Sequence, residues 1–222
     1  IDIFALSETW QCTTTTPSQL FDITPSDFQY LGLPRFCDNS VRSSNTGGGL
    51  GFLVRDVLCP ETISFPSYSS FELFVINVKS SSAKLTIFNV YRPPDSSHSK
   101  PFSTSLDEFG SLLSSVATLP HEFFITGDFN IHVNNSTNTH ASQFLSLLAS
   151  SNLQQHVLVP THNSNNTLDL VITSCQSGLS PVIDISAASP SDHFLVLSSM
   201  QFQPPPPKAA VLHSFRRIRS ID

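Results

Sequence analysis

Two polar side chains at the end of one apolar stretch have types and spacing that suit phosphoester chemistry. Residues 123–130 read FFITGDFN, so Asp128 and Asn130 follow Gly127 two positions apart. Side chains two apart on a strand point to the same side, and a glycine lets a ligand or another backbone come close. A carboxylate beside a carboxamide can orient a water or hold a metal and donate to an oxyanion. For this stretch alone, an ordinary Asp/Asn turn is an equally good interpretation.

Polar side chains also mark four other apolar stretches, each near an end of the stretch or within it. They are Glu8, the pair Tyr91 and Arg92, Asp169, and the pair Asp192 and His193. Taken singly, most have ordinary explanations, such as an exposed charge, a half-buried phenol or a turn residue. Asp169 is harder to explain, because a carboxylate among Leu, Val and Ile is costly unless it is paired. His193 is a candidate partner, since a carboxylate favours the charged imidazole. The recurrence of such residues predicts one shared site.

Apolar periodicity predicts the elements that must position these residues. Strands are expected over 1–6, 50–55, 71–78, 84–91, 123–130, 167–173, 182–186 and 193–202, and helices over 102–118 and 142–150. This order predicts an α/β (α+β) fold in which mixed sheets pack together with helices outside. One domain is expected over 1–203. Four prolines at 204–207 then begin a stiff linker, and a basic tail runs to residue 222.

Composition and charge limit the possible functions. The 222 residues carry a net charge of −6 with a pI near 5.7, whereas proteins that bind duplex DNA tightly are usually basic. An acidic chain is still compatible with a metal-dependent nuclease, whose carboxylates hold the cation that meets the phosphate. The four scattered cysteines argue against zinc and against a disulfide framework, and neither a membrane-spanning run nor a signal peptide is visible. We therefore expect an intracellular protein with reduced thiols and no membrane partner.

The motifs around these residues, taken together, resemble the endonuclease/exonuclease/phosphatase superfamily over about residues 1–202. They are Glu-Thr at 8–9, Asn-Val-Tyr-Arg-Pro-Pro at 89–94, Gly-Asp-Phe-Asn at 127–130, Leu-Asp-Leu-Val at 168–171 and Ser-Asp-His at 191–193. The glycine run at 47–51 and Pro-Thr-His at 160–162 are most similar to the endonuclease domain of non-LTR (LINE-type) retrotransposons. The resemblance implies a four-layer α-β-β-α sandwich of two mixed, mainly antiparallel sheets. It also implies that the family's first strand is lacking, because residue 1 already lies in the Glu8 strand.

The resemblance also implies how water and metal are handled. Glu8 is similar to the carboxylate that ligates Mg²⁺ (or Mn²⁺), and Asp192 to a further carboxylate near that ion. Asp128 is similar to the group that orients or deprotonates the attacking water. Asn130 is similar to a donor to the phosphate or to that water. Phosphodiester hydrolysis needs a positioned water and a neutralised phosphate charge, and these residue types supply both.

The remaining candidates are implied to contact the phosphate. Tyr91 is similar to a phosphate-contacting phenol, and His193 to a cationic donor to the phosphate oxygens that Asp169 holds in place. Arg92 lies next to Tyr91 and is expected to touch the substrate backbone. The substrate-binding group implied for this chain is therefore Arg92, Asn130 and Tyr91.

These roles imply an enzyme that hydrolyses phosphodiesters and nicks DNA, leaving a 3′-hydroxyl that primes reverse transcription. Its partners are expected to be the target DNA and a reverse transcriptase domain beyond the tail, so it is expected to act in the nucleus. A phosphatase or deadenylase of the same superfamily is an alternative, although the Pro-rich linker argues against a free-standing phosphatase. A truncated, inactive remnant or a binding module is another alternative, which the lacking first strand favours.

Overall fold

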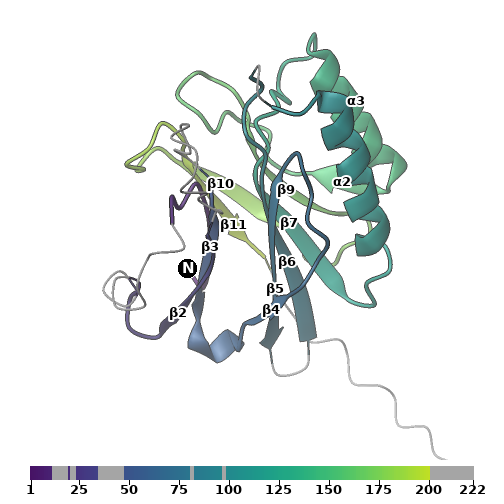
Figure 1. Ribbon diagram of the computed structural model, residues 1–222. Helices are drawn as coiled ribbons and strands as arrows, with labels where there is room; N and C mark the ends of the chain where they lie inside the picture. The colour runs from purple at the N-terminus through teal and green to yellow at the C-terminus, as the bar shows by residue number, and fades with distance from the viewer. Residues whose placement is uncertain (12–19, 21–23, 35–47, 81–82, 97–98, 201–222) are drawn as a thin grey trace, which may run out of the picture.

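The computed structural model describes residues 1–11, 20, 24–34, 48–80, 83–96 and 99–200, which form two layers of strands and a layer of helices (Figure 1). The large sheet has the strand order β4-β5-β6-β7-β9-β8. Its strands span Glu61–Ile63 (β4), Glu72–Ser80 (β5), Ala83–Tyr91 (β6), Glu122–Asp128 (β7), Leu153–Gln155 (β8) and Asp169–Ser174 (β9). All neighbouring pairs are antiparallel except β6 and β7. These two are parallel because helix α2 (Phe102–Val116) crosses between them.

A second layer of strands lies on the face of the large sheet opposite the helices (Figure 1). It consists of an antiparallel sheet of order β1-β3-β2 and the antiparallel pair β10-β11. Its strands span Ile3–Ser7 (β1), Phe28–Leu33 (β2), Leu50–Arg55 (β3), Val182–Ser186 (β10) and Leu195–Ser199 (β11), and a short 3₁₀ turn, η1 (Asp56–Leu58), follows β3. Among the described residues, β1 and β2 are the edges of the first of these sheets, and β10 and β11 pair only with each other.

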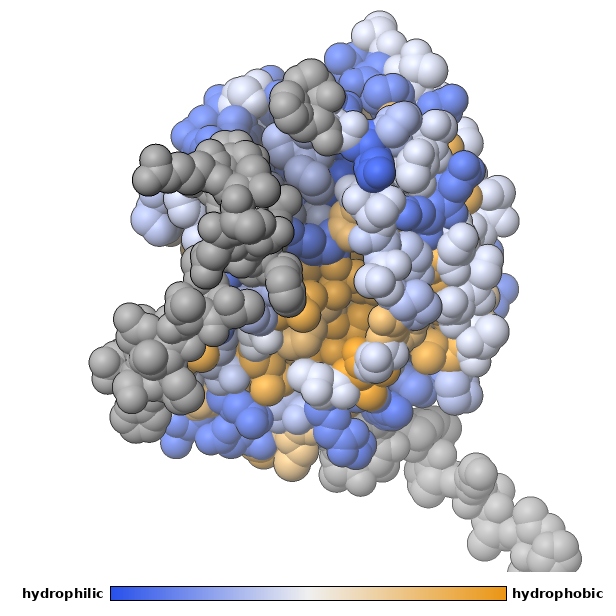
Figure 2. Space-filling model, viewed as in Figure 1, coloured by the Kyte–Doolittle hydropathy of each residue, from blue (hydrophilic) through white to orange (hydrophobic). Residues whose placement is uncertain are grey.

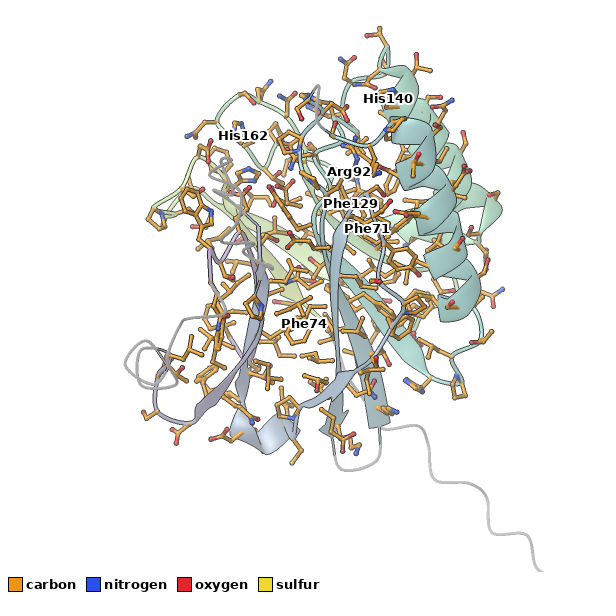
Figure 3. All side chains as sticks on the ribbon, in the orientation of Figure 1. Phe71, Phe74, Arg92, Phe129, His140 and His162 are labelled. Atoms are coloured by element: carbon orange, nitrogen blue, oxygen red, sulfur yellow. The ribbon has the colours of Figure 1, made fainter. Side chains whose placement is uncertain are left out.

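Two apolar cores hold the layers together, and alternation along the large sheet supplies both of them. On β7, for example, Ile125 packs toward the helices and Phe124 toward the second layer. Figure 3 shows Phe74 between the sheets and Phe71 and Phe129 on the helical side. Part of this apolar interior is visible in a hollow with polar margins (Figure 2). The layers therefore fix the strand ends that carry the candidate site residues.

The predicted fold class is confirmed, and most predicted elements appear close to their expected positions. Helix α3 (Thr139–Ser150) begins three residues early because Asn138 caps it, its Oδ1 accepting from the Ala141 N–H at 3.1 Å. The pattern does not predict β2, β4 or β8, and three-residue strands such as β4 and β8 are too short to show a period. Both helices with described bounds cover the large sheet, so neither supplies the outer layer implied for the second one. The boundary predicted at 203 and the tail lie outside the described residues.

The described part of the chain also bears on the thiols and on membranes. Cys59 and Cys175 are free and exposed, whereas Cys12 and Cys37 lie outside the described residues. In the portion that the structure describes, no helix combines the length and the apolar character needed to cross a bilayer.

Candidate active site

Three neighbouring strands of the large sheet place polar side chains at the same level. Tyr91 is paired with Asp128 across β6 and β7, and Asp128 is paired with Asp169 across β7 and β9. Residues directly opposite each other on adjacent strands point to the same face of a sheet. Tyr91 packs into the core between the sheets, so all three side chains face the second layer. They form what we call the carboxylate row, and the structure thus brings together three of the residues that the sequence singles out.

Glu8 reaches the carboxylate row from the second layer. It follows β1 with a φ of 52°, and the Tyr91 hydroxyl donates a short hydrogen bond to its Oε1. The glycine run holds this turn, because the Thr9 N–H donates to the Gly49 carbonyl at 3.1 Å. Gly48 and Gly49 both have a φ of 84°, a conformation that favours glycine. Burial and the Glu8 carboxylate raise the pKa of Tyr91, so its phenol stays protonated as a donor.

Asn130 holds the Asp128 carboxylate through two hydrogen bonds. Its backbone N–H donates to Oδ1 at 3.0 Å and its Nδ2 donates to Oδ2 at 2.8 Å. Asn130 has a φ of 48°, which ends β7 at Asp128 and turns the carboxamide back toward it. Burial, and then the charge of Asp169, raise the pKa of Asp128 to about 7. A carboxyl group with a pKa near neutrality is suited to accept a proton from water.

Asp169 holds His193 in a hydrogen-bonded ion pair. The distance from His193 Nδ1 to Asp169 Oδ2 is 2.8 Å, and this bond raises the pKa of His193 to about 9. The imidazole is therefore protonated at neutral pH, and because Nδ1–H donates to Asp169, Nε2–H is the donor that remains for a ligand. Thr161 fixes both partners: its carbonyl accepts from the Phe194 N–H at 2.7 Å, and its Oγ1 accepts from the Asp169 N–H at 3.1 Å.

Gly127 allows β6 and β7 to pair beside the carboxylate row. Its φ is 131°, and a Cβ there would overlap the carbonyl oxygen of Val90, so the close neighbour expected from the sequence is another backbone. We expect Gly127→Ala to lower the free energy of unfolding by about 2–4 kcal/mol, because the backbone must shift. Urea denaturation measures this loss. In the control Gly110→Ala on α2, the new Cβ meets only Leu147 at 3.9 Å, and stability should hold. Equal midpoints for Gly127→Ala and the parent would contradict this account.

Two candidate residues lie differently from the positions that the resemblance implies. The Asp192 side chain is 67% exposed, and its Oδ2 lies 3.1 Å from His162 Nε2; no contact joins it to Glu8 within the described ranges. Arg92 is only 4% exposed, and its guanidinium contacts protein groups, namely the Asn130 carbonyl, Ser105 and Asp95. The geometry therefore gives no support to direct contact between Arg92 and substrate. The sequence identifies His162 only as part of a motif, because its pairing with Asp192 depends on how two loops fold together.

The oxygen-rich composition of the carboxylate row fits a hard divalent cation. Ligand atoms of Asp128, Asp169 and His193 all lie within 4.8 Å of one another, and the Glu8 charge also acts on Asp128. Carboxylates brought together repel one another, which a bound cation relieves, and Mg²⁺ and Mn²⁺ prefer oxygen ligands. Since Asp169 is paired with His193, and Asn130 holds Asp128, Glu8 is the carboxylate that would hold such an ion beside them.

Comparisons with known proteins agree with this arrangement. Residues 85–197, just over half of the chain, match a family described as endonuclease-reverse transcriptase. The chain belongs to the endonuclease-reverse transcriptase family. No curated protein matches the sequence.

Several solved structures have the same fold as this member of the endonuclease-reverse transcriptase family, although their sequences are less than 20% identical to it. The endonuclease domain of TRAS1, a telomere-specific non-LTR retrotransposon, is 17% identical, with 76% of each chain covered and a TM-score of 0.54. The human nocturnin catalytic domain is 16% identical over 90% of this chain and 81% of that one, with a TM-score of 0.56. The 3′ phosphatase NExo from Neisseria, bound to a product DNA hairpin, is 13% identical over 90% and 89%, with a TM-score of 0.58. The fold is therefore that of the endonuclease/exonuclease/phosphatase superfamily.

Proposed function

We propose that this chain is a metal-dependent phosphodiesterase that nicks DNA and leaves a 3′-hydroxyl for reverse transcription. The observation that carries the proposal is that one site holds a proton acceptor, Asp128, and a hydrogen-bond donor, His193, whose ligand atoms lie within 4.8 Å of each other. Asp128 has a pKa of about 7 and His193 a pKa of about 9. Between these values, one group is ready to accept a proton and the other to donate a hydrogen bond to an anion.

In the proposed reaction, the ionised Asp128 carboxylate takes a proton from the water that attacks phosphorus. Asn130 keeps that carboxylate in place through its two hydrogen bonds. A new P–O bond forms as the P–O3′ bond breaks, and the leaving 3′-oxygen takes up a proton from solvent. The products are a 3′-hydroxyl and a 5′-phosphate.

In the same proposal, His193 and Tyr91 stabilise the negative charge of the phosphate by hydrogen bonds. His193 donates from Nε2–H to a non-bridging oxygen while Asp169 holds the ring. The neutral Tyr91 phenol lies next to Glu8 and can donate to the same phosphate once its bond to Glu8 is exchanged. A divalent cation bound by Glu8 and its neighbours would neutralise further charge on the phosphate and on the leaving oxygen.

The proposed substrate and partner are DNA and a reverse transcriptase. In support, TRAS1 is a retrotransposon endonuclease, NExo is bound to a DNA hairpin, and the family description names a reverse transcriptase. We place the catalytic domain at 1–203 and propose that 204–222 lead toward the reverse transcriptase. Action on chromosomal DNA places the protein in the nucleus.

Hydrolysis of a smaller phosphomonoester is a second candidate, which the charge of the described residues favours. Of the five described lysines and arginines, Arg55, Lys79 and Arg92 are engaged in ion pairs with carboxylates, so only the exposed Lys84 and Lys100 offer positive charge to a duplex from this part of the chain. Affinity for duplex DNA depends largely on neutralised phosphates.

Two assays run side by side distinguish these candidates. A nicked duplex whose new 3′ ends a DNA polymerase extends without pretreatment is the result expected for the endonuclease. Release of inorganic phosphate from a 3′-phosphorylated oligonucleotide, without nicks, would assign the chain to the phosphatases. A folded protein that does neither would support the inactive remnant.

Removal of divalent metal is expected to abolish cleavage, because His193 alone among the described cations of the site cannot neutralise both the converging carboxylates and the phosphate. A readout independent of activity is thermal stability: Mn²⁺ should raise the Tm, as any ligand of the native state does. The increase should disappear in Glu8→Gln and persist in the control Glu61→Gln, which lies on edge strand β4 and pairs with Lys79 at 2.7 Å. Full cleavage in excess EDTA would contradict the metal requirement.

A further inference from the structure

Arg92 and Asn130 hold each other through both backbone and side chain. Asn130 Nδ2 donates to the Arg92 carbonyl at 2.9 Å, and Arg92 Nη1 donates back to the Asn130 carbonyl at 3.2 Å. The Arg92 N–H also donates to the Asp128 carbonyl at 2.9 Å. The segments that leave β6 and β7 are thus locked together immediately after the carboxylate row. We refer to this arrangement as the Arg92–Asn130 pair.

The Arg92 guanidinium is itself fixed from several directions. Its Cζ lies 5.3 Å from the centroid of the Phe102 ring, Nε donates to Ser105 Oγ at 3.4 Å, and Nη2 makes a short ion pair with Asp95 Oδ1. The other Asp95 oxygen lies 3.6 Å from Nδ1 of His140, whose ring stacks on Phe102 at 4.0 Å between centroids. Such partners leave the guanidinium little freedom to turn toward solvent.

Arg92 lies on the opposite side of Asn130 from the reacting groups. Figure 3 shows it beside Phe129, and Phe129 packs into the core under the helices. The carboxylate row, by contrast, faces the second layer, where Tyr91 packs. A residue in this position acts on the site only through the backbone and side chain that it holds.

We propose that Arg92 is a positioning residue that holds the Asn130 carboxamide against the Asp128 carboxylate. This inference rests on the proposed function, in which Asp128 accepts the proton of water. A non-glycine residue with a φ of 48° keeps that conformation when its surroundings determine it. Arg92 determines the conformation of Asn130 in two ways. Its Nη1 donates to the Asn130 carbonyl, and its own carbonyl accepts from the Asn130 side chain. Lysine cannot replace it, because a single ammonium cannot reproduce the planar set of donors that meets three partners.

The substitution Arg92→Lys tests this role with a matched control. The control is Arg55→Lys. Arg55 also contacts a phenylalanine ring (Phe28, 5.0 Å from Cζ to the centroid) and an aspartate (Asp2, 2.9 Å), but it lies at the end of β3 that is away from Glu8. On a short duplex, kcat of Arg92→Lys should fall by about 10-fold or more while KM stays within about twofold, since only the reacting geometry is lost. Arg55→Lys should change neither constant.

A second background separates positioning from direct contact with DNA. In Asn130→Ala, adding Arg92→Lys should lower kcat no further, because both changes remove the same effect. If Arg92 instead bound a substrate phosphate, KM would rise in both backgrounds and the dependence of affinity on salt would weaken by about one charge. That result would overturn the inference.

A spectroscopic readout keeps this inference separate from the proposed function. The ¹⁵N side-chain amide signals of Asn130 should shift in Arg92→Lys and in Asp95→Asn, and stay in place in Arg55→Lys. Asp95 is 53% exposed, so Asp95→Asn serves if Arg92→Lys does not fold, with an expected loss of about threefold in kcat. If the parent protein cleaves no phosphodiester, the proposed function fails and these signals still test the pair. Signals that do not move in a folded variant would overturn it.

Discussion

Replacing Asp128 by asparagine is expected to remove phosphodiester cleavage and at the same time to stabilise the protein at pH 8. Asparagine keeps the shape of the side chain but cannot take a proton from water, so the rate should fall by about 10²–10⁴-fold. The same change removes a buried charge that the fold tolerates at a cost. Opposite effects on activity and stability are typical of a residue kept for function.

The stabilisation should depend on pH in a defined direction. In the folded protein the pKa of Asp128 is about 7, whereas the ordinary pKa of an aspartate side chain is 3.8. Between these values the native state keeps a proton that the unfolded state has lost, so the parent loses stability as pH rises through this window. The full cost is present above pH 7, and at about 1.4 kcal/mol for each unit of pKa it is roughly 4 kcal/mol. Asparagine avoids this cost. Its own amide NH₂ would however face the Asn130 Nδ2 donor, and the lost hydrogen bond offsets about 1 kcal/mol of the gain in stability.

Urea denaturation at pH 4.5 and pH 8 measures this difference. We expect Asp128→Asn to match or fall below the parent at pH 4.5 and to exceed it by about 1–3 kcal/mol at pH 8. A stability difference that is the same at both values would show that the Asp128 carboxyl is not held with a raised pKa. The activity loss would then need another explanation.

Loss of His193 is expected to have the next largest effect, and its partner should control the pH profile. His193→Ala should lower the rate by about 10²–10⁴-fold, because the phosphate loses its charged donor. In the parent, the rate should rise as Asp128 ionises near pH 7 and fall as His193 loses its proton near pH 9. The rising and falling limbs of this pH–rate profile report apparent pKa values of the pair, because the two groups interact.

Asp169→Asn provides the sharper test of the same pair. The hydrogen bond to Asp169 is the main cause of the raised His193 pKa, and the Asp169 charge also raises that of Asp128. Removing the charge should therefore move both limbs of the kcat/KM profile to lower pH, while Glu61→Gln should leave both in place. An alkaline limb that stays near pH 9 in Asp169→Asn would contradict the assignment of that limb to His193.

The row of Tyr91, Asp128 and Asp169 could be anticipated because strand alternation and strand ends are visible in a single sequence. Gly127 also stands out, and the backbone group that comes close to it is the Val90 carbonyl. The strand was expected to continue to residue 130, but the left-handed Asn130 ends it at Asp128. A positive φ at asparagine leaves no periodic signal.

Arg92 and Asp192 show what a single sequence does not contain. Whether an arginine next to a proline pair is buried depends on where α2 packs, since Phe102 and Ser105 come from that helix. Asp192 pairs with His162 because segments 161–163 and 192–194 run beside each other, an arrangement of two loops far apart in the chain. Local periodicity carries no information on either contact.

The most direct test of the central claim is a nicking assay on supercoiled plasmid with Mg²⁺, comparing this chain with Asp128→Asn. We predict that the parent converts the plasmid to the open circular form, that EDTA prevents the conversion, and that the variant fails to nick although its Tm at pH 8 is higher. Nicking at the parental rate by a folded Asp128→Asn protein would contradict the assignment of Asp128 as the proton acceptor and, with it, the proposed active site.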